Sequence, residues 1–235
     1  MTQLVSVTEN DNFMQLTMDD GKRNAVSFAM AEELNAGLDR AEAAGKVVVL
    51  SGRPGTLSAG FDLKVMMQRD DDMVRLVRAG ADLAQRMITF AQPVVLAVPG
   101  HALAMGALLC LAADYRIGVL GDFKIGLNEV AIGMTLPWFG VELARARLGS
   151  QSLNNSVGLA RVYTPAEAAA VGYLDECVAD HQLSAKIDEV ASQLAALDSK
   201  AHHNTKLRAR ETLIERYEVA LQKDFENGEV MASLG

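Results

Sequence analysis

The sequence lacks the features that mark several common classes of protein. Among its 235 residues are two cysteines, Cys110 and Cys177, which do not stand in a metal-binding or redox spacing, so we expect two reduced thiols. No apolar run approaches the ~20 residues of a membrane span, and the N-terminal segment shows no basic region followed by an apolar one. We therefore expect neither a membrane anchor nor a secretory signal, and we predict a cytoplasmic protein.

The chain also has fewer basic than acidic residues. The chain has 22 Lys and Arg residues against 30 Asp and Glu residues, which gives a net charge of −8. Because nucleic-acid binding usually requires a basic face, no nucleic-acid partner is expected, and any anionic ligand must be met by local Lys or Arg. Half of the residues are hydrophobic, which is enough for a sizeable core, and the length suits one large domain or one domain with an appendage.

The first half of the chain alternates between strand and helix patterns. Residues 4–7 and 13–18 flank a polar segment and predict a hairpin. Residues 46–51 and 93–98 are apolar without alternation, as strands buried on both faces should be, and a helix of roughly residues 70–90 separates them. This repetition predicts βαβ units and a largely parallel sheet.

Start signals locate the helices and short strands of the chain. Helices are predicted after the N-cap residue Ser27, at Pro137 and after the capping-box residue Thr164. The run of three aspartates from Asp70 marks a helix start rather than a metal site. Residues 123–129 and 174–178 predict short strands, and the chain is helical and increasingly charged from about Gln182.

One stretch, residues 100–118, stands at the centre of the prediction. It begins with a glycine-bounded turn, continues with small apolar residues without a charge until Asp114, and ends in a short β-like run, residues 115–117. This pattern predicts a buried helix whose first turn faces a pocket. The free backbone N–H groups at such a helix start favour negative charge.

Two glycine-containing loops are candidates for one anion site. Residues 59–61 follow the predicted strand at 46–51, and residues 104–106 follow the predicted strand at 93–98. If those strands are neighbours in a parallel sheet, both loops lie at its carboxyl edge, where ligands bind. Two N–H groups aimed at one carbonyl oxygen would stabilise an enolate. The alternative is that both loops are simply turns.

Glu129 is the best acid–base candidate. It lies in a mostly apolar run, so partial desolvation would raise its pKa toward a value useful for proton transfer; alternatively it faces solvent or caps the next helix. His101 is either a general base or, as is more common for a lone histidine in a turn, structural. Basic residues that either meet phosphates or are simply surface charge are Lys22, Arg23, Arg53 and Lys64.

Five motifs follow one another in a specific order and spacing. They are NAV at 24–26, SAGFDL at 58–63, GHALAMG at 100–106, ADYRI at 113–117 and GLNE at 126–129. From about Leu4 to Val178 the chain thereby resembles the crotonase (enoyl-CoA hydratase/isomerase) superfamily. The resemblance implies an α/β fold, with a crotonase-like spiral of ββα units over residues 1–180 and a C-terminal helical trimerisation or lid module over residues 181–235. It also implies a homotrimer or a hexamer made of two trimers.

The resemblance further implies an acyl-CoA thioester as substrate, with no other cofactor and no metal. It places the oxyanion hole on the backbone N–H groups of Phe61 and Met105 and the proton chemistry on Glu129. Implied contacts to CoA or substrate, with adenine and phosphates near residues 22–25, fall on Lys22, Arg23, Ala25, Ala59, Gly60, Asp62, Leu63, Gly106, Leu108 and Trp138. Residues that form either an adaptable apolar acyl pocket or simply core are Phe61, Met66, Met67, Met105, Met134, Trp138 and Phe139.

One departure from the family pattern bears on the reaction. Hydratases of this family carry two glutamates that share a water; one position falls on Glu129 and the other on Leu108, which cannot move a proton. Members that shift a double bond can work with one glutamate, so isomerisation of an enoyl-CoA through a dienolate is the favoured prediction. The alternatives are a hydratase-like lyase that uses Glu129 alone and a non-catalytic acyl-CoA-binding relative. A Clp-type serine peptidase is disfavoured because its nucleophilic serine falls on Ala104.

Overall fold

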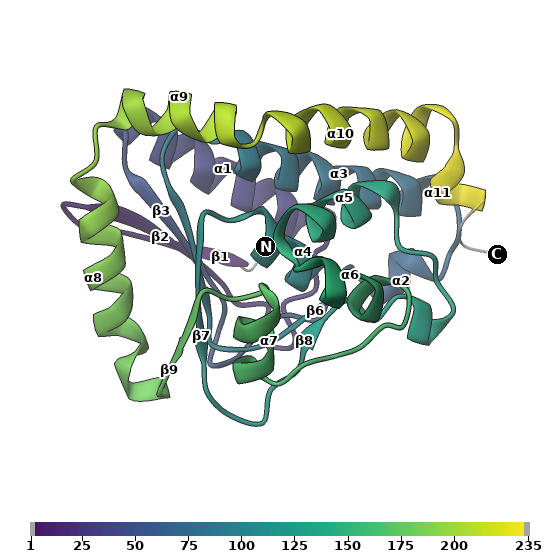
Figure 1. Cartoon of the computed structure of the whole chain (residues 1–235), viewed down its shortest axis with the longest axis horizontal. Helices are drawn as coiled ribbons and strands as arrows, with labels where there is room; N and C mark the ends of the chain where they lie inside the picture. The colour runs from purple at the N-terminus through teal and green to yellow at the C-terminus, as the bar shows by residue number, and fades with distance from the viewer. Residues whose placement is uncertain (1–2, 233–235) are drawn as a thin grey trace.

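The strands form one large and one small sheet, surrounded by helices (Figure 1). The computed structural model describes residues 3–232, so residues 233–235 of the predicted C-terminal region lie outside the described part, as residues 1–2 do. Within the described part, the large sheet has six strands in the order β1-β2-β3-β5-β7-β9, and the small sheet has three in the order β4-β6-β8. The predicted mixed α/β architecture with a helical C-terminal region is confirmed.

The elements have the following bounds. The strands are β1 Val5–Glu9, β2 Phe13–Met18, β3 Val47–Ser51, β4 Gly55–Ser58, β5 Val94–Val98, β6 Gly100–Leu103, β7 Tyr115–Val119, β8 Ile125–Gly126 and β9 Glu176–Val178. The first helices are α1 Phe28–Ala44, α2 Leu63–Met66, α3 Asp71–Thr89, α4 Met105–Ala112, α5 Trp138–Arg147, α6 Ser150–Val157 and α7 Pro165–Val171. The C-terminal helices are α8 Leu183–Ala195, α9 Ser199–Ala209, α10 Glu211–Leu221 and α11 Glu229–Ala232, with a π-helical turn at Gln222–Glu226 between the last two.

The large sheet begins as a hairpin and continues in parallel. β1 and β2 pair antiparallel with Val5 opposite Met18, as predicted. Each further pair in the sheet is parallel, and β3 pairs directly with β5, with Val48 opposite Val94. The predicted parallel layer is therefore confirmed, and the segments that follow β3 and β5 leave the same edge of the sheet.

β3 is apolar throughout because both faces of the large sheet are covered. Successive side chains of a strand point to opposite faces. Val47 and Val49 accordingly pack in a cluster with Ile187 of α8, whereas Val48 and Leu50 belong to the main core with residues of α1, α3 and α4. Burial on both faces explains why this strand lacks the alternating pattern of a half-exposed one.

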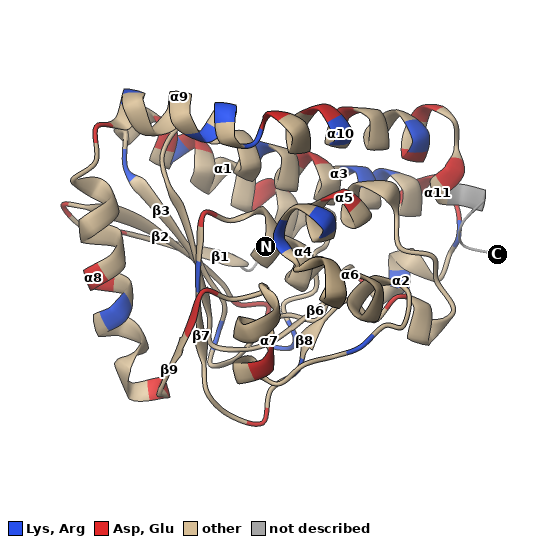
Figure 2. Ribbon diagram, viewed as in Figure 1, with Lys and Arg blue, Asp and Glu red and all other residues tan. Residues whose placement is uncertain are grey.

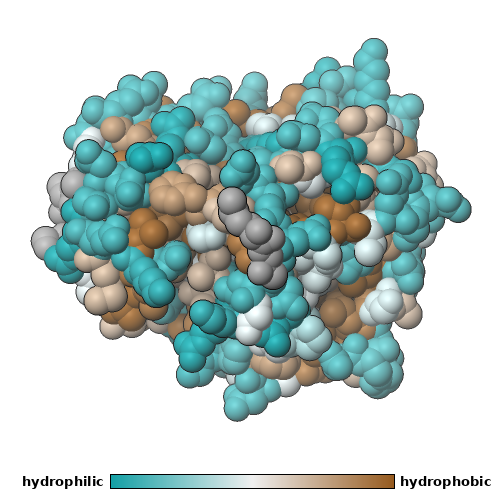
Figure 3. All heavy atoms as spheres, turned by 180° about the vertical axis from the view of Figure 1, so that it is seen from behind, coloured by the Kyte–Doolittle hydropathy of each residue, from teal (hydrophilic) through white to brown (hydrophobic). Residues whose placement is uncertain are grey.

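The C-terminal helices cover the core from two sides. α8 lies against the large sheet, whereas α9 and α10 run alongside α1 and α3 (Figure 1), and α10 packs on α3 and α5. Figure 2 shows basic residues on α9 and both acidic and basic residues along α10. On the face seen in Figure 3, hydrophilic side chains dominate and separate smaller apolar patches. Among the described helices, none combines the length and hydrophobicity that crossing a membrane requires.

Short elements account for the differences from the predicted pattern. Residues 55–66, for which no strand or helix was predicted, contain β4 and α2. The turn expected after Gly100 is β6, and the strand expected at residues 123–129 is limited to β8. Helix α6 was not predicted. Elements of two to four residues are too short to show a period. The strands among them are stabilised by pairing within the small sheet.

The aspartate run is a helix start, as predicted. One carboxylate oxygen of Asp70 accepts the amides of Asp72 and Met73 at 3.1 and 3.3 Å and so caps α3. Among residues 3–232, no group of three or more His, Cys, Asp or Glu side chains is placed to hold a metal ion.

Candidate active site

The two predicted loops meet beyond the carboxyl ends of β3 and β5. Val26 forms a parallel bridge with Phe61: its N–H donates to the carbonyl of Gly60 at 2.8 Å, and its carbonyl accepts the N–H of Asp62 at 3.1 Å. In a parallel bridge the residue between the two bonded partners turns its own N–H the other way. The N–H of Phe61 therefore points away from Val26.

The amide of Met105 is oriented by backbone strain at the preceding residue. Ala104 has φ +48° and ψ −120°, a conformation that a residue with a side chain rarely adopts. Its own N–H donates to the carbonyl of Gly126 at 3.1 Å, which holds the segment in place. Met105 is the first residue of α4, where a backbone N–H has no acceptor within the helix. Among the described residues, neither this N–H nor that of Phe61 donates to a protein acceptor.

The loops touch at Gly60 and Ala104. A β-carbon added to Gly60 would lie 2.8 Å from the β-carbon of Ala104 and 3.6 Å from the amide nitrogen of Met105. Gly60 also has φ +105°, so both its conformation and its surroundings require glycine. The segments that carry the two free amides are therefore in direct contact.

A buried polar network joins the segment at residues 20–25 to these loops. The side chain of Asn24 is buried; its Nδ2 donates to the carbonyl of Met18 at 2.9 Å, and its Oδ1 accepts the N–H of Asp20. The hydroxyl of Ser58 donates to the carbonyl of Asn24 at 2.6 Å, and the N–H of Ala59 donates to the carbonyl of Arg23 at 3.0 Å. The predicted ligand segments at 22–25 and 59–62 are thus brought side by side.

Glu129 lies in a small cavity next to these loops. The cavity measures about 30 Å³, and its described lining residues are Phe61, Met66, Val77, Leu108, Glu129, Met134, Thr135, Pro137, Phe139 and Val230. Glu129 is 8% exposed, and no hydrogen-bond partner for its Oε2 occurs in the described part of the chain. Burial raises the pKa of this carboxyl from 4.5 to about 7, because the charged form loses its hydration. The prediction of a desolvated glutamate is confirmed.

This arrangement can support proton transfer next to a carbonyl group. Phe61 lines the cavity with Glu129, and Leu108 lies one helical turn after Met105, so both free amides belong to segments that border the cavity. Two N–H groups at the start of α4 and beside it can stabilise a developing oxyanion. A carboxyl group with a pKa of about 7 can take and return a proton at neutral pH.

Several predicted residues border the site without lining the cavity. Gly106 packs so closely that an added β-carbon would lie 2.5 Å from the carbonyl oxygen of Ser58. Asp62 caps α2 by accepting the N–H of Lys64 at 2.9 Å. Residues that lie on the surface near the loops are Lys22, Arg23, Leu63 and Lys64, whereas Ala25 and Ala59 are half-buried.

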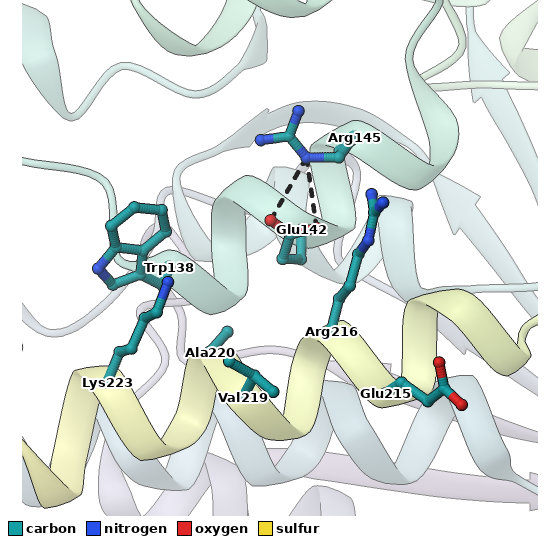
Figure 4. Close-up of a pocket in the computed structure, with 8 residues that line it drawn as sticks. All are labelled: Trp138, Glu142, Arg145, Glu215, Arg216, Val219, Ala220 and Lys223. Atoms are coloured by element: carbon teal, nitrogen blue, oxygen red, sulfur yellow. Dashed lines mark hydrogen bonds and ion pairs between the residues drawn. The ribbon is translucent and has the colours of Figure 1, made fainter.

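Trp138 and Met67, which were expected either in an acyl pocket or in the core, do not line the cavity. Met67 is 79% exposed. The indole N–H of Trp138 donates to Glu229 at 2.7 Å, and the ammonium group of Lys223 lies 4.1 Å from its ring centre. Figure 4 shows this tryptophan at one end of a hollow of about 560 Å³ between α5 and α10. That hollow is larger than the Glu129 cavity but contains neither Glu129 nor the two amides.

His101 has a structural role. Its Nδ1 accepts the backbone N–H of Lys124 at 3.0 Å, and its ring packs edge-on against Phe123. It lies in β6 rather than in the cavity, so the structural interpretation of this histidine is the one that the geometry supports.

The resemblance implied a trimerisation or lid module over residues 181–235, but the sequence did not indicate which residues of this region reach the cavity. Val230 is 1% exposed and forms part of the wall around Glu129. The carboxylate of Asp224, also buried, accepts the N–H groups of Trp138 and Phe139, each at 3.0 Å, and so caps α5 from 85 residues away. The residues around Asp224 are mostly polar, and nothing in them indicates where the segment docks.

Comparisons with known proteins agree with this geometry. The sequence model of the enoyl-CoA hydratase/isomerase family matches residues 8–231. Human mitochondrial enoyl-CoA delta isomerase 1 is 29% identical to this chain over 211 residues, which cover 87% of this chain and 69% of that protein.

Solved structures extend the similarity to the fold. An enoyl-CoA hydratase/isomerase family protein from Pseudomonas syringae has a TM-score of 0.92 at 44% identity, covering 94% of this chain and 96% of that one. An apo enoyl-CoA isomerase from Mycobacterium tuberculosis has a TM-score of 0.90 at 35% identity, covering 94% and 97% of the two chains.

Proposed function

Because this chain belongs to the enoyl-CoA hydratase/isomerase family, and is thus an enzyme of the crotonase superfamily, we propose that it moves the double bond of an enoyl-CoA. The substrate is a 3-enoyl-CoA thioester and the product is the conjugated 2-enoyl-CoA. One observation carries the proposal: Glu129 is the only ionisable side chain among the described residues that line the cavity.

The reaction needs one proton-transfer group and one anion site. The thioester oxygen accepts the N–H groups of Phe61 and Met105. The Glu129 carboxylate removes a proton from C2, and the electrons of that C–H bond form a dienolate whose negative charge rests on the thioester oxygen. The protonated Glu129 then gives the proton to C4, the C2–C3 double bond forms, and the carboxylate is restored.

Leu108 supports isomerisation over hydration. Hydration needs a water that is held and deprotonated beside the double bond. A water requires two to four polar partners, and among the described lining residues only Glu129 and Thr135 have polar side chains. Leu108 offers that water no hydrogen bond, so Glu129 is left with proton transfer between carbon atoms.

The remaining parts of the proposal concern the rest of the ligand and the assembly. The segment at residues 22–25 contacts the adenine and phosphates of CoA, with the exposed Lys22 and Arg23 supplying positive charge. No cofactor beyond the CoA thioester is needed by this chemistry. We propose a homotrimer or a hexamer for the assembly, and the cytoplasmic location stays a prediction.

Substrate turnover tests the proposal. Incubation with a 3-enoyl-CoA is expected to increase the absorbance of the conjugated thioester, and Glu129→Gln is expected to lower that rate by roughly 10²-fold or more. Glu142→Gln, on α5 outside the cavity, is the matched control and should keep the wild-type rate. Loss of absorbance from a 2-enoyl-CoA would instead indicate hydration, and full activity of Glu129→Gln would refute the assigned role.

A further inference from the structure

Gly80, in the middle of α3, lies against both residues that carry the free amides. A β-carbon at this position would lie 2.5 Å from Cε1 and Cζ of the Phe61 ring and 3.2 Å from Sδ of Met105. Atoms in ordinary van der Waals contact are about 3.5–4.0 Å apart. We propose that Gly80 is a positioning residue: by leaving this space empty it lets the side chains of Phe61 and Met105 rest on α3, which sets the direction of their backbone N–H groups. The inference rests on the oxyanion role proposed above for those two amides.

Space, rather than backbone conformation, is what requires glycine at this position. Gly80 lies in a regular helix, and its φ is not among the positive values found for glycines of this chain. Glycine is also the least favourable residue in a helix interior apart from proline. An alanine would suit the helix better if the Phe61 ring and the Met105 sulfur did not occupy its place.

A side chain at Gly80 would act directly on the cavity. Phe61 lines the cavity with Glu129, and Val77, one turn before Gly80 on the same helix, lines it as well. A Phe61 ring pushed off α3 therefore moves into a space of about 30 Å³ or takes its backbone with it. The first movement obstructs the substrate, and the second turns the N–H away from the thioester oxygen.

The test compares two glycines that are equally crowded but differently placed. Gly80→Ala is the test variant. Gly37→Ala is the control, because a β-carbon there would lie 2.6 Å from Cδ2 of Leu16, in the middle of α1 and away from the cavity. Both variants are compared with the wild type for kcat on a 3-enoyl-CoA and for the infrared carbonyl stretch of bound 2-enoyl-CoA, which falls in wavenumber when the oxygen accepts hydrogen bonds.

The two readouts separate the possible failures. We expect Gly80→Ala to lower kcat by about tenfold or more and to return the carbonyl stretch toward its value in solution, whereas Gly37→Ala keeps the wild-type stretch. A wild-type stretch and kcat in folded Gly80→Ala would overturn the role of Gly80. The absence of any shift in the wild type would instead overturn the oxyanion role of the amides.

A second pair of variants keeps the test decisive if Gly80→Ala does not fold. Leucine at position 61 lacks the Cε1 and Cζ atoms that a β-carbon would meet, but it keeps the backbone N–H. In the Phe61→Leu background, Gly80→Ala is therefore expected to fold and to change kcat by about twofold or less, a much smaller effect than removal of an oxyanion donor. Failure to fold, or a tenfold loss of kcat in this background also, would overturn the positioning of Phe61 by Gly80.

Discussion

Glu129 and Leu108 line the same cavity of about 30 Å³, so an ionisable carboxyl group shares its space with an aliphatic side chain. The pKa of the Glu129 carboxyl stays raised at about 7 because the Leu108 side chain does not replace the hydration that the carboxyl loses on burial. A second carboxylate at the position of Leu108 would change both the charge and the water content of the cavity. The aliphatic side chain at position 108 therefore contributes both to the raised pKa of Glu129 and to the choice between proton transfer and hydration.

The pH dependence of turnover should follow the pKa of Glu129. The carboxylate is the active base, and burial raises its pKa to about 7, so kcat/KM for a 3-enoyl-CoA should rise tenfold per pH unit below pH 7 and level off above it. A carboxyl with an ordinary pKa would place this change near pH 4.5. Rates measured from pH 5 to pH 9 check the prediction, and a profile that is flat over this range would contradict it.

The same group should make the protein less stable at higher pH. Between pH 4.5 and about 7 the folded protein keeps the Glu129 proton that the unfolded chain has lost, so the free energy of unfolding falls as the pH rises through this window. The full effect is on the order of 3 kcal/mol. Glu129→Gln cannot lose a proton, so its stability relative to the wild type should improve by up to about this amount between pH 4.5 and pH 7.5.

Urea unfolding at the two pH values measures this difference. Glu142→Gln serves as the control, because Glu142 pairs with Arg145 on α5 and lies outside the cavity. An unchanged difference between Glu129→Gln and the wild type at both pH values would show that Glu129 titrates normally.

Much of this site could be predicted because its parts obey local rules. The unbroken apolar character of residues 47–51 indicated a strand covered on both faces, and the loop that follows such a strand in a parallel sheet lies at the ligand edge. The apolar surroundings of Glu129 in the chain likewise indicated a desolvated carboxyl. In both cases the deciding interactions involve residues that are close in sequence or belong to one sheet.

The parts that could not be predicted depend on docking between distant segments. Val230 completes the cavity wall about 100 residues after Glu129, and Asp224 caps a helix that begins 86 residues before it. The N–H of Ala104, a residue in a strained conformation, donates to the carbonyl of Gly126, which lies 22 residues later in the chain. No local period or motif reports such contacts, since they depend on which surfaces meet in the folded chain.

The buried carboxylate of Asp224 should hold the C-terminal segment closed over the cavity. Asp224→Ala would leave the amides of Trp138 and Phe139 without their acceptor, at a cost of about 2 kcal/mol. It would also release the segment that carries Val230, so water would reach Glu129 and lower its pKa toward 4.5. Chemical unfolding and the pH profile of kcat/KM measure the two effects.

A substitution on the same turn provides the control for Asp224. Glu226 is exposed in the π-helical turn, so Glu226→Ala should leave both the stability and the pH profile close to those of the wild type. If Asp224→Ala lost stability but kept a pH profile centred near 7, the C-terminal segment would not be what shields Glu129.

The carboxylate of Asp114 should be a main anchor of α9 on the core. Its Oδ2 lies 2.7 Å from Nζ of Lys206, and its Oδ1 lies 2.7 Å from Nη2 of Arg210. The Lys206 side chain is only 3% exposed. Desolvation lowers the pKa of Lys206 to about 8 despite its attraction to Asp114, so this ammonium depends on its partner to remain charged. Asp114→Asn leaves both cations without a counter-charge and should lower the free energy of unfolding by about 3–5 kcal/mol.

The exposed pair of Asp82 with Arg78 is the matched control, because Asp82→Asn should cost only about 0.5 kcal/mol. Equal losses for the two variants in urea unfolding would mean that the buried cluster does not hold the C-terminal helices in place.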